Sequence, residues 1–136
     1  MGDFRPLGPL GKIALVAEIL RDYVPMWRLL SHPNLVEMAH AARDVHPGTA
    51  RGPAELEHRT ALRLGRAVSR TLRLLPTDSR CLIRSLVLTR VMARRSIPGT
   101  IVIGVTRSPE FEAHAWVEHG GEPILPAGEF TRLTEV

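Results

Sequence analysis

Apolar and polar residues recur with helical spacing through the first two thirds of the chain. Apolar positions return every three or four residues over 11–30, 35–43, 54–75 and 80–94, which predicts four helices. Pro25 is expected to end or kink the first helix, and Pro76 closes the third. For the first helix, the spacing predicts a core face that consists of Ile13, Val16, Ala17 and Leu20, continued by Val24 and Trp27.

After Pro98 and Gly99 the period changes to that of strands. Residues 100–105 are a β-branched run, and residues 112–119 and 122–125 predict two further strands joined by a tight turn at Gly120–Gly121. No helix separates the strands, so we expect an α+β fold in which N-terminal helices precede a Cys-bearing helix packed on a small antiparallel sheet. The 136 residues fit a single domain, 1–136, with a helical part at 1–76 and a catalytic core at 77–136.

Composition narrows the class of protein. The chain is 44% hydrophobic and 24% charged, which is typical of globular domains. Its apolar stretches are too short to predict a membrane span, and no basic region precedes the apolar stretch 11–20, so no secretion signal is expected. Cys81 is the single cysteine, which excludes an intrachain disulfide and favours a cytoplasmic location.

Positive charge is concentrated in the middle of the chain. The net charge is +4, and residues 51–95 carry most of the arginines. On the third predicted helix one stripe is basic, and the opposite stripe, the expected core face, is apolar. The basic stripe consists of Arg59, Arg63, Arg66, Arg70 and Arg73, and the apolar stripe of Ala61, Leu64, Val68, Leu72 and Leu75. The basic stripe is either a solvated face or a surface for an acidic leader peptide or partner protein. Nucleic-acid binding is disfavoured because no aromatic residues are interleaved with the stripe and no helix-turn-helix or zinc-finger motif accompanies it.

Cys81 and His114 are the candidate catalytic pair. Cys81 falls in the first turn of a predicted helix, where free backbone N–H groups and the helix dipole favour an anion such as a thiolate. His114 lies in a predicted strand, where alternation places it on one face with Trp116 and Glu118. A buried structural cysteine and a packed histidine are the alternatives. The other histidines are expected to be structural or solvated, and their spacing gives no sign of a metal site.

Two segments together resemble a known family. Residues 79–86 read Ser-Arg-Cys-Leu-Ile-Arg-Ser-Leu, and residues 113–118 read Ala-His-Ala-Trp-Val-Glu, with the strand 101–105 between them. This order resembles the transglutaminase-like cysteine proteases of lasso peptide biosynthesis, the B2 leader peptidase type. The resemblance covers about residues 74–133 and is weaker over the N-terminal helices.

The resemblance implies a reaction and partners. The enzyme would cut a ribosomally made precursor peptide and remove its leader, with Cys81 as nucleophile and His114 as base and acid. The Cys81 backbone N–H would contribute to an oxyanion hole, and Trp116 would either wall the cleft or pack in the core. A separate leader-recognition protein of the B1 type and an ATP-dependent lasso cyclase are the implied partners. No cofactor is implied, and no phosphate-binding glycine loop is present.

The sequence departs from the family at the third catalytic position. The family places an acidic residue about a dozen positions after the histidine, where this chain has Ala127 beside Pro126. Glu129 is the nearest substitute, and a backbone carbonyl or a water molecule is the alternative for orienting the imidazole. Two other functions stay open: a non-catalytic leader-binding module of the same fold, and another acyl-transfer enzyme such as an amidase or a transglutaminase.

Overall fold

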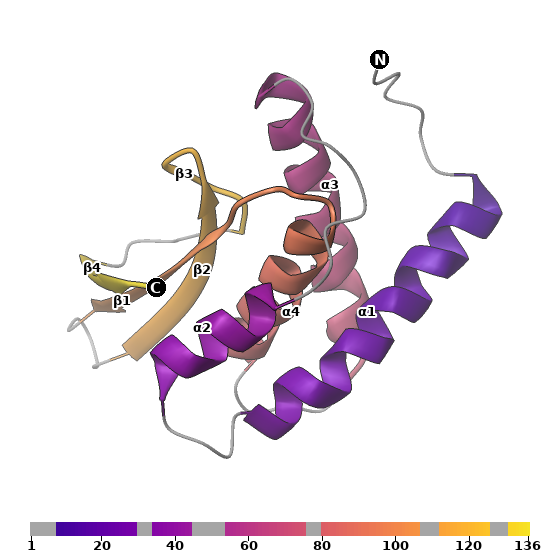
Figure 1. Ribbon diagram of the computed structural model, residues 1–136. Coiled ribbons are helices and arrows are strands. Elements are labelled where there is room, and N and C mark those ends of the chain that lie inside the picture. Colours follow the sequence, from indigo (N-terminus) through magenta and orange to yellow (C-terminus); the bar gives the residue numbers. More distant parts are fainter. Residues whose placement is uncertain (1–7, 30–33, 45–53, 76–79, 107–111, 126–130) are drawn as a thin grey trace.

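Four helices cover one side of a four-stranded antiparallel sheet in the computed structural model of the chain (Figure 1). The structure describes residues 8–29, 34–44, 54–75, 80–106, 112–125 and 131–136. The helices are α1 (Pro9–Leu29), α2 (Leu35–Arg43), α3 (Ala54–Leu72) and α4 (Arg80–Arg94). The strands are β1 (Thr100–Thr106), β2 (Glu112–His119), β3 (Glu122–Pro123) and β4 (Thr131–Glu135). The α+β fold predicted from the sequence is therefore confirmed.

Helix α4 is the centre of the fold, and it contacts the three other helices as well as β1 and β2. Six of its apolar side chains are fully buried, namely Ile83, Leu86, Val87, Leu88, Val91 and Met92. Burial on so many sides gives α4 a fixed position, because each of these side chains would lose about 1.5–3 kcal/mol by returning to water. The helix that carries Cys81 is therefore a rigid base for a functional group.

The sheet has the strand order β3-β2-β1-β4, and all of its neighbouring strands are antiparallel. β2 and β3 are joined by Gly120 and Gly121, whose φ angles are +60° and +83°. Glycine adopts these left-handed values without a steric penalty, and two such residues in succession form the tight hairpin turn that the sequence predicts. β3 is shorter than predicted. β4 was not predicted from the sequence, because its residues are exposed and mostly polar and it pairs with β1 through the backbone.

Helix α1 runs from Pro9 to Leu29, close to the predicted range 11–30, and it continues through Pro25. Its buried face differs from the prediction, because Leu15, Ile19 and Met26 are buried. The residues predicted to face the core are mostly exposed, since Ile13 is 65% exposed and Trp27 is 53% exposed. The predicted core face of this helix was therefore wrong.

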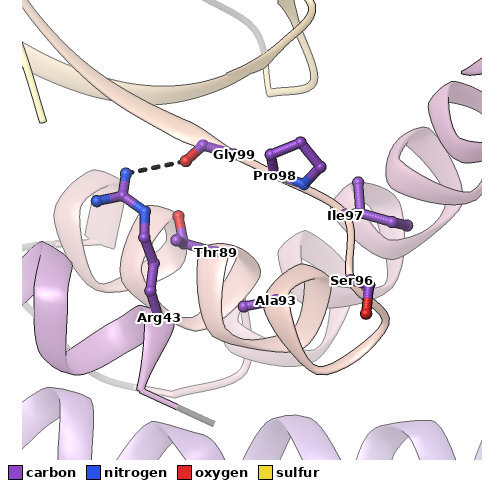
Figure 2. Close-up of a pocket in the computed structure, with 7 residues that line it drawn as sticks. All are labelled: Arg43, Thr89, Ala93, Ser96, Ile97, Pro98 and Gly99. Carbon is purple, nitrogen blue, oxygen red and sulfur yellow. Dashed lines mark hydrogen bonds between the residues drawn. The ribbon is translucent and has the colours of Figure 1, made fainter. Parts of the chain in front are cut away.

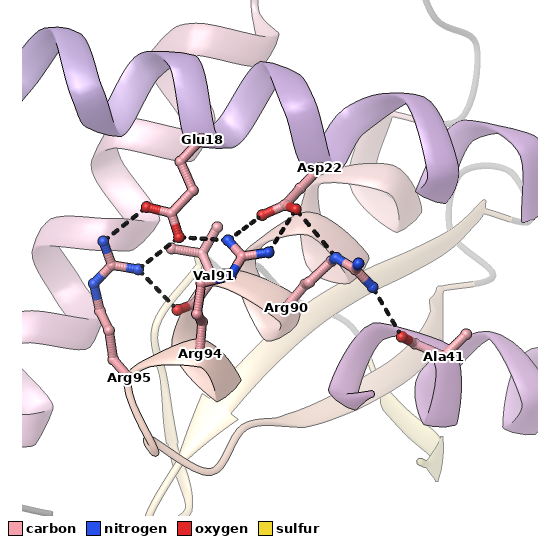
Figure 3. A network of polar contacts seen from close by, with 7 residues as sticks. All are labelled: Glu18, Asp22, Ala41, Arg90, Val91, Arg94 and Arg95. Atoms are coloured by element: carbon pink, nitrogen blue, oxygen red, sulfur yellow. Dashed lines mark hydrogen bonds and ion pairs between the residues drawn. The ribbon is translucent and has the colours of Figure 1, made fainter. Parts of the chain in front are cut away.

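Ion pairs between α1 and α4 account for the orientation of α1 (Figure 3). Asp22 is 2% exposed, and its carboxylate accepts hydrogen bonds from Arg90 at 3.1 Å and from Arg94 at 2.8 Å through each oxygen. Glu18 pairs with Arg94 and, at 2.9 Å through each oxygen, with Arg95. Turning α1 to bury its other apolar face would withdraw both carboxylates from these arginines and leave the buried charges uncompensated.

Helix α3 presents the two faces that the sequence predicts. Ala61, Leu64, Val68 and Leu72 are buried, and Leu75, which follows the end of the helix, is packed against the core. The helix ends at Leu72, three residues earlier than predicted. None of the helices in the described part of the chain combines the length and the apolar composition needed to cross a membrane.

Candidate functional site

Cys81 lies in the first turn of α4, as the sequence predicts, and its half-buried thiol is free. The backbone N–H groups of this turn have no acceptor within the helix, and no acidic residue lies in the turn. Arg84 is one turn further along the helix, so helix dipole and side-chain charge both favour an anion here. The Ser85 hydroxyl donates to the Cys81 carbonyl oxygen at 2.8 Å, which adds a side-chain bond to the backbone of the Cys-bearing turn.

His114 lies in β2, also as predicted, directly opposite Gly104 of β1. Its half-buried imidazole stacks on the indole of Trp116, with ring centroids 5.9 Å apart and planes inclined by 25°. Gly104 has no side chain, so its place beside His114 adds no steric limit to the ring. Trp116 is 3% exposed and belongs to the hydrophobic core, and its ring supports His114 from one side.

Glu118 and Arg132 extend this arrangement in a way that sequence reasoning missed. The Trp116 indole N–H donates to Glu118 at 3.0 Å, and Arg132 of β4 donates to both carboxylate oxygens of Glu118 at 2.6 Å. Burial raises the pKa of Glu118, but the hydrogen bonds from Trp116 and Arg132 and the charge of Arg132 outweigh it and hold that pKa below its ordinary value. A carboxylate is thus linked to His114 through Trp116. The alternation of side chains along β2 already places Glu118 on the same face as His114 and Trp116. Its partner Arg132 was missed because β4 was not predicted from the sequence.

The two faces of β2 have different neighbours. Val117 and Met92 of α4 both border Gly99, and His119 lies against Glu57 of α3, so this side of the strand faces the helices. Because side chains alternate along a strand, His114, Trp116 and Glu118 share the other face. The pairing of His114 with Cys81 stays a prediction.

The third catalytic position lies outside the described residues. Glu129, the proposed substitute for the family's acidic residue, falls in the undescribed segment 126–130, as do Pro126 and Ala127. The assignment of Glu129 therefore stays a prediction. In the described part of the chain, Glu118 is the carboxylate that is connected to His114, through the ring of Trp116.

The predicted basic stripe of α3 faces outward. Arg59, Arg66, Arg70 and Arg73 are exposed and Arg63 is half-buried. Arg59 pairs with Glu55 at 3.1 Å on the helix surface. The role of this stripe as a partner or leader surface stays a prediction.

A pair of histidines joins α3 to the end of β2. The Nδ1 atoms of His58 and His119 are 3.4 Å apart and the two rings stack, while Glu57 lies 3.4 Å from His119 and Glu122 lies 3.4 Å from His58. These residues hold the β2–β3 turn against the helix. Within the described ranges, no group of three or more histidine, cysteine or acidic side chains is arranged to hold a metal ion.

A cavity of about 270 Å³ lies at the opposite end of α4 from Cys81 (Figure 2). The Arg43 guanidinium crosses from α2 and donates to the carbonyl oxygens of Gly99 at 2.9 Å and Val136 at 2.7 Å. Burial lowers the pKa of Arg43. These bonds tie α2 to the sheet, so Arg43 has a structural role that does not involve Cys81.

Comparison with known families decides the classification. The sequence profile described as "Transglutaminase-like superfamily" matches residues 26–136, which include both Cys81 and His114. The chain belongs to the transglutaminase-like superfamily. Searches of curated proteins and of solved structures gave no match. Membership in the superfamily indicates cysteine-protease or acyl-transfer chemistry, and the α+β architecture agrees with a transglutaminase-like core.

Proposed function

We propose that this protein is a cysteine peptidase that removes the leader from a ribosomally made lasso precursor peptide. The observation that carries the proposal is the placement of a free, half-buried Cys81 at the start of α4 within a transglutaminase-like chain. The helix packs against β2, the strand that contains His114. The assignment to lasso precursors comes from the sequence around these two residues, Arg-Cys-Leu and Ala-His-Ala-Trp-Val-Glu.

The reaction follows nucleophilic acyl transfer. His114 takes the proton from the Cys81 thiol, and the sulfur attacks the carbonyl carbon of the scissile peptide bond. The carbon–nitrogen bond breaks, the imidazolium returns its proton to the departing amine, and the leader remains on sulfur as a thioester. Water, deprotonated by His114, then hydrolyses the thioester and restores the thiol.

The start of α4 supplies the electrostatic part of this mechanism. A negative charge develops on the carbonyl oxygen when Cys81 attacks it, and the backbone N–H of Cys81 belongs to the first turn, whose donors have no acceptor within the helix. The same N-terminal end of α4 therefore stabilises the oxyanion that forms in the attack.

The first experiment is a cleavage assay with a synthetic lasso precursor peptide, read by mass spectrometry. We expect Cys81→Ala to lower the rate by roughly 10³-fold or more and His114→Ala by roughly 10²–10⁴-fold. His40→Ala is the matched control, because His40 is exposed on α2. A Cys81→Ala variant that cleaves as fast as the wild type would refute the proposal, and a fully active His114→Ala variant would remove His114 from it.

A second candidate is amine transfer, which the superfamily description itself favours. In that reaction a primary amine, instead of water, resolves the thioester. Adding putrescine to the cleavage assay separates the two activities, because hydrolysis gives a free carboxylate and transfer gives an amide of higher mass. Precursor that binds without either product would favour a non-catalytic binding module.

The residue that orients His114 can be identified with two variants. Glu129→Gln tests the position that the sequence favours, and Glu118→Gln tests the carboxylate that Trp116 connects to the imidazole ring. The orienting carboxylate is the one whose loss lowers kcat and shifts the pH profile of kcat without a matching rise in KM. If neither variant changes the profile, a backbone carbonyl or water is the remaining way to hold the ring.

We also propose two protein partners. A separate B1-type recognition protein would deliver the precursor, and the ATP-dependent lasso cyclase would use the amine that cleavage frees. The proposal of these partners comes from the resemblance of the segments around Cys81 and His114 to the B2 type of leader peptidase. Co-purification of the three tagged proteins, with and without precursor, measures whether they associate.

A further inference from the structure

Helix α1 exposes a continuous apolar stripe to solvent. Its members are Leu10, Ile13, Val16, Leu20, Val24 and Trp27, which are between 41% and 82% exposed. They recur at steps of three and four, so they lie along one side of the helix, away from the buried Leu15, Ile19 and Met26. Most of the stripe precedes residue 26, where the match to the transglutaminase-like superfamily begins. The shared catalytic fold therefore does not account for it.

The ion pairs of α1 with α4 hold this stripe outward. Asp22 and Glu18 face Arg90, Arg94 and Arg95 on the buried side (Figure 3). Large apolar side chains therefore stay in contact with water, because a rotation of α1 that buried them would break these ion pairs. A contiguous apolar surface of this kind is typical of an interaction site.

A groove between α1 and α3 adjoins the stripe. It encloses about 340 Å³. Leu15, Val16 and Ala67 form its apolar lining, and Thr71 also borders it. Positive charge comes from Lys12 and from three arginines of α3, namely Arg63, Arg66 and Arg70. Val16 belongs to both the groove and the stripe, and none of the described residues that line the groove is acidic. Its chemistry therefore fits an acidic segment that also carries apolar side chains.

The positive surface continues toward the Cys-bearing helix. A second depression, of about 270 Å³, shares Arg66 and Arg70 with the groove and adds Arg73 and Arg84. Arg84 lies one turn after Cys81 on α4, and its Nε is buried without a hydrogen-bond partner among the described residues. An anionic chain that lies in the groove is thus led by successive arginines toward the turn that carries the nucleophile.

We infer that the groove between α1 and α3 binds an acidic, amphipathic segment of the substrate's leader. Apolar side chains of the segment pack on Val16 and its neighbours in the stripe, and its carboxylates meet Arg66 and Arg70. The identity of the occupant rests on the proposed function. A substrate segment fits better than a membrane surface, because the site is concave and leads to the Cys-bearing helix, whereas a bilayer needs a flat or convex apolar face.

The test measures binding in the Cys81→Ala background, so that it does not depend on turnover. The probe is the fluorescein-labelled leader of the precursor peptide used in the cleavage assay, and its Kd is read by anisotropy at several salt concentrations. We expect Arg66→Glu/Arg70→Glu to raise Kd by roughly tenfold or more and to weaken its salt dependence. Val16→Asp should raise Kd to a similar extent with little change in salt dependence. Arg59→Glu is the control, because Arg59 pairs with Glu55 and lines neither depression.

Each outcome decides the inference. Unchanged Kd in both groove variants, with wild-type circular dichroism, would overturn it. So would binding of the leader only when the recognition protein is added, or a groove that binds phosphatidylglycerol vesicles in place of the leader. Leader binding that the groove variants weaken, without cleavage by the wild type, would support the groove and refute the peptidase. Cleavage by the wild type that the groove variants leave unchanged would support the peptidase and refute the groove.

Discussion

The orientation of α1 rests on Asp22, and its replacement by alanine provides a direct measurement. Asp22 is 2% exposed and accepts three charge-assisted hydrogen bonds, one from Arg90 and two from Arg94. Removing one partner of a buried ion pair costs about 3–5 kcal/mol. The two arginine side chains are 22% and 24% exposed and so retain some hydration, which places the expected loss near the lower end, about 3 kcal/mol.

Urea unfolding followed by circular dichroism measures this loss. A loss of about 3 kcal/mol is a large part of the roughly 5–15 kcal/mol that stabilises a typical domain. It should lower Tm by roughly 10 °C. Glu55→Ala is the control, because the pair of Glu55 with Arg59 is exposed on α3 and should contribute at most about 0.5 kcal/mol.

Tryptophan fluorescence tests the structural reason separately. The chain has two tryptophans, of which Trp27 is 53% exposed on α1 and Trp116 is 3% exposed in β2. Acrylamide should quench Trp27 readily in the wild type. If Asp22→Ala lets α1 turn its apolar stripe inward, this quenching will decrease. A variant that loses less than about 1 kcal/mol and keeps wild-type quenching would refute the claim that these ion pairs orient the helix.

Two further predictions concern stability. Burial raises the pKa of Glu18, but hydrogen bonds and charge from Arg95 and Arg94 outweigh it and hold that pKa below the ordinary 4.5. The stabilisation of the folded state by Glu18 should therefore be fully present above about pH 4.5. It should be lost as the pH falls through the pKa of Glu18 in the folded state. Unfolding titrations between about pH 3 and 6 check this, and Glu18→Gln should flatten the dependence. Gly65→Ala should lower the free energy of unfolding by about 1 kcal/mol, although alanine has the better helix propensity. The added Cβ would lie 3.0 Å from Ile124 Cγ2 and 3.3 Å from the Ile124 carbonyl oxygen. A gain in stability, measured by urea unfolding, would show that Ile124 moves away freely.

The sequence predicted most elements because local signals agree there. The bounds of α2 and α4 match the prediction, and the Gly120–Gly121 turn has the backbone conformation expected of it. Helix α1 is different because it has two apolar faces of similar strength. The choice between them is made by arginines that are some seventy residues away along the chain, so periodicity within α1 could not reveal it.

The candidate site could be predicted only where local sequence signals determine it. The elements that carry Cys81 and His114 follow from local pattern, and both residues lie where the sequence placed them. The partner of Glu118 could not be predicted, because Arg132 lies on a short polar strand without strand-like periodicity. How the start of α4 meets the sheet also depends on tertiary packing, which no local signal encodes.

Strand β4 forms one outer edge of the sheet, and every residue of it is exposed. An open edge offers unpaired backbone groups to which a strand of another molecule can add, and this is a common route to aggregation. Here the edge is only five residues long and carries Arg132 and Glu135. Short length and charge both discourage such an addition, so the strand that supplies a partner to Glu118 also protects the protein against forming fibres.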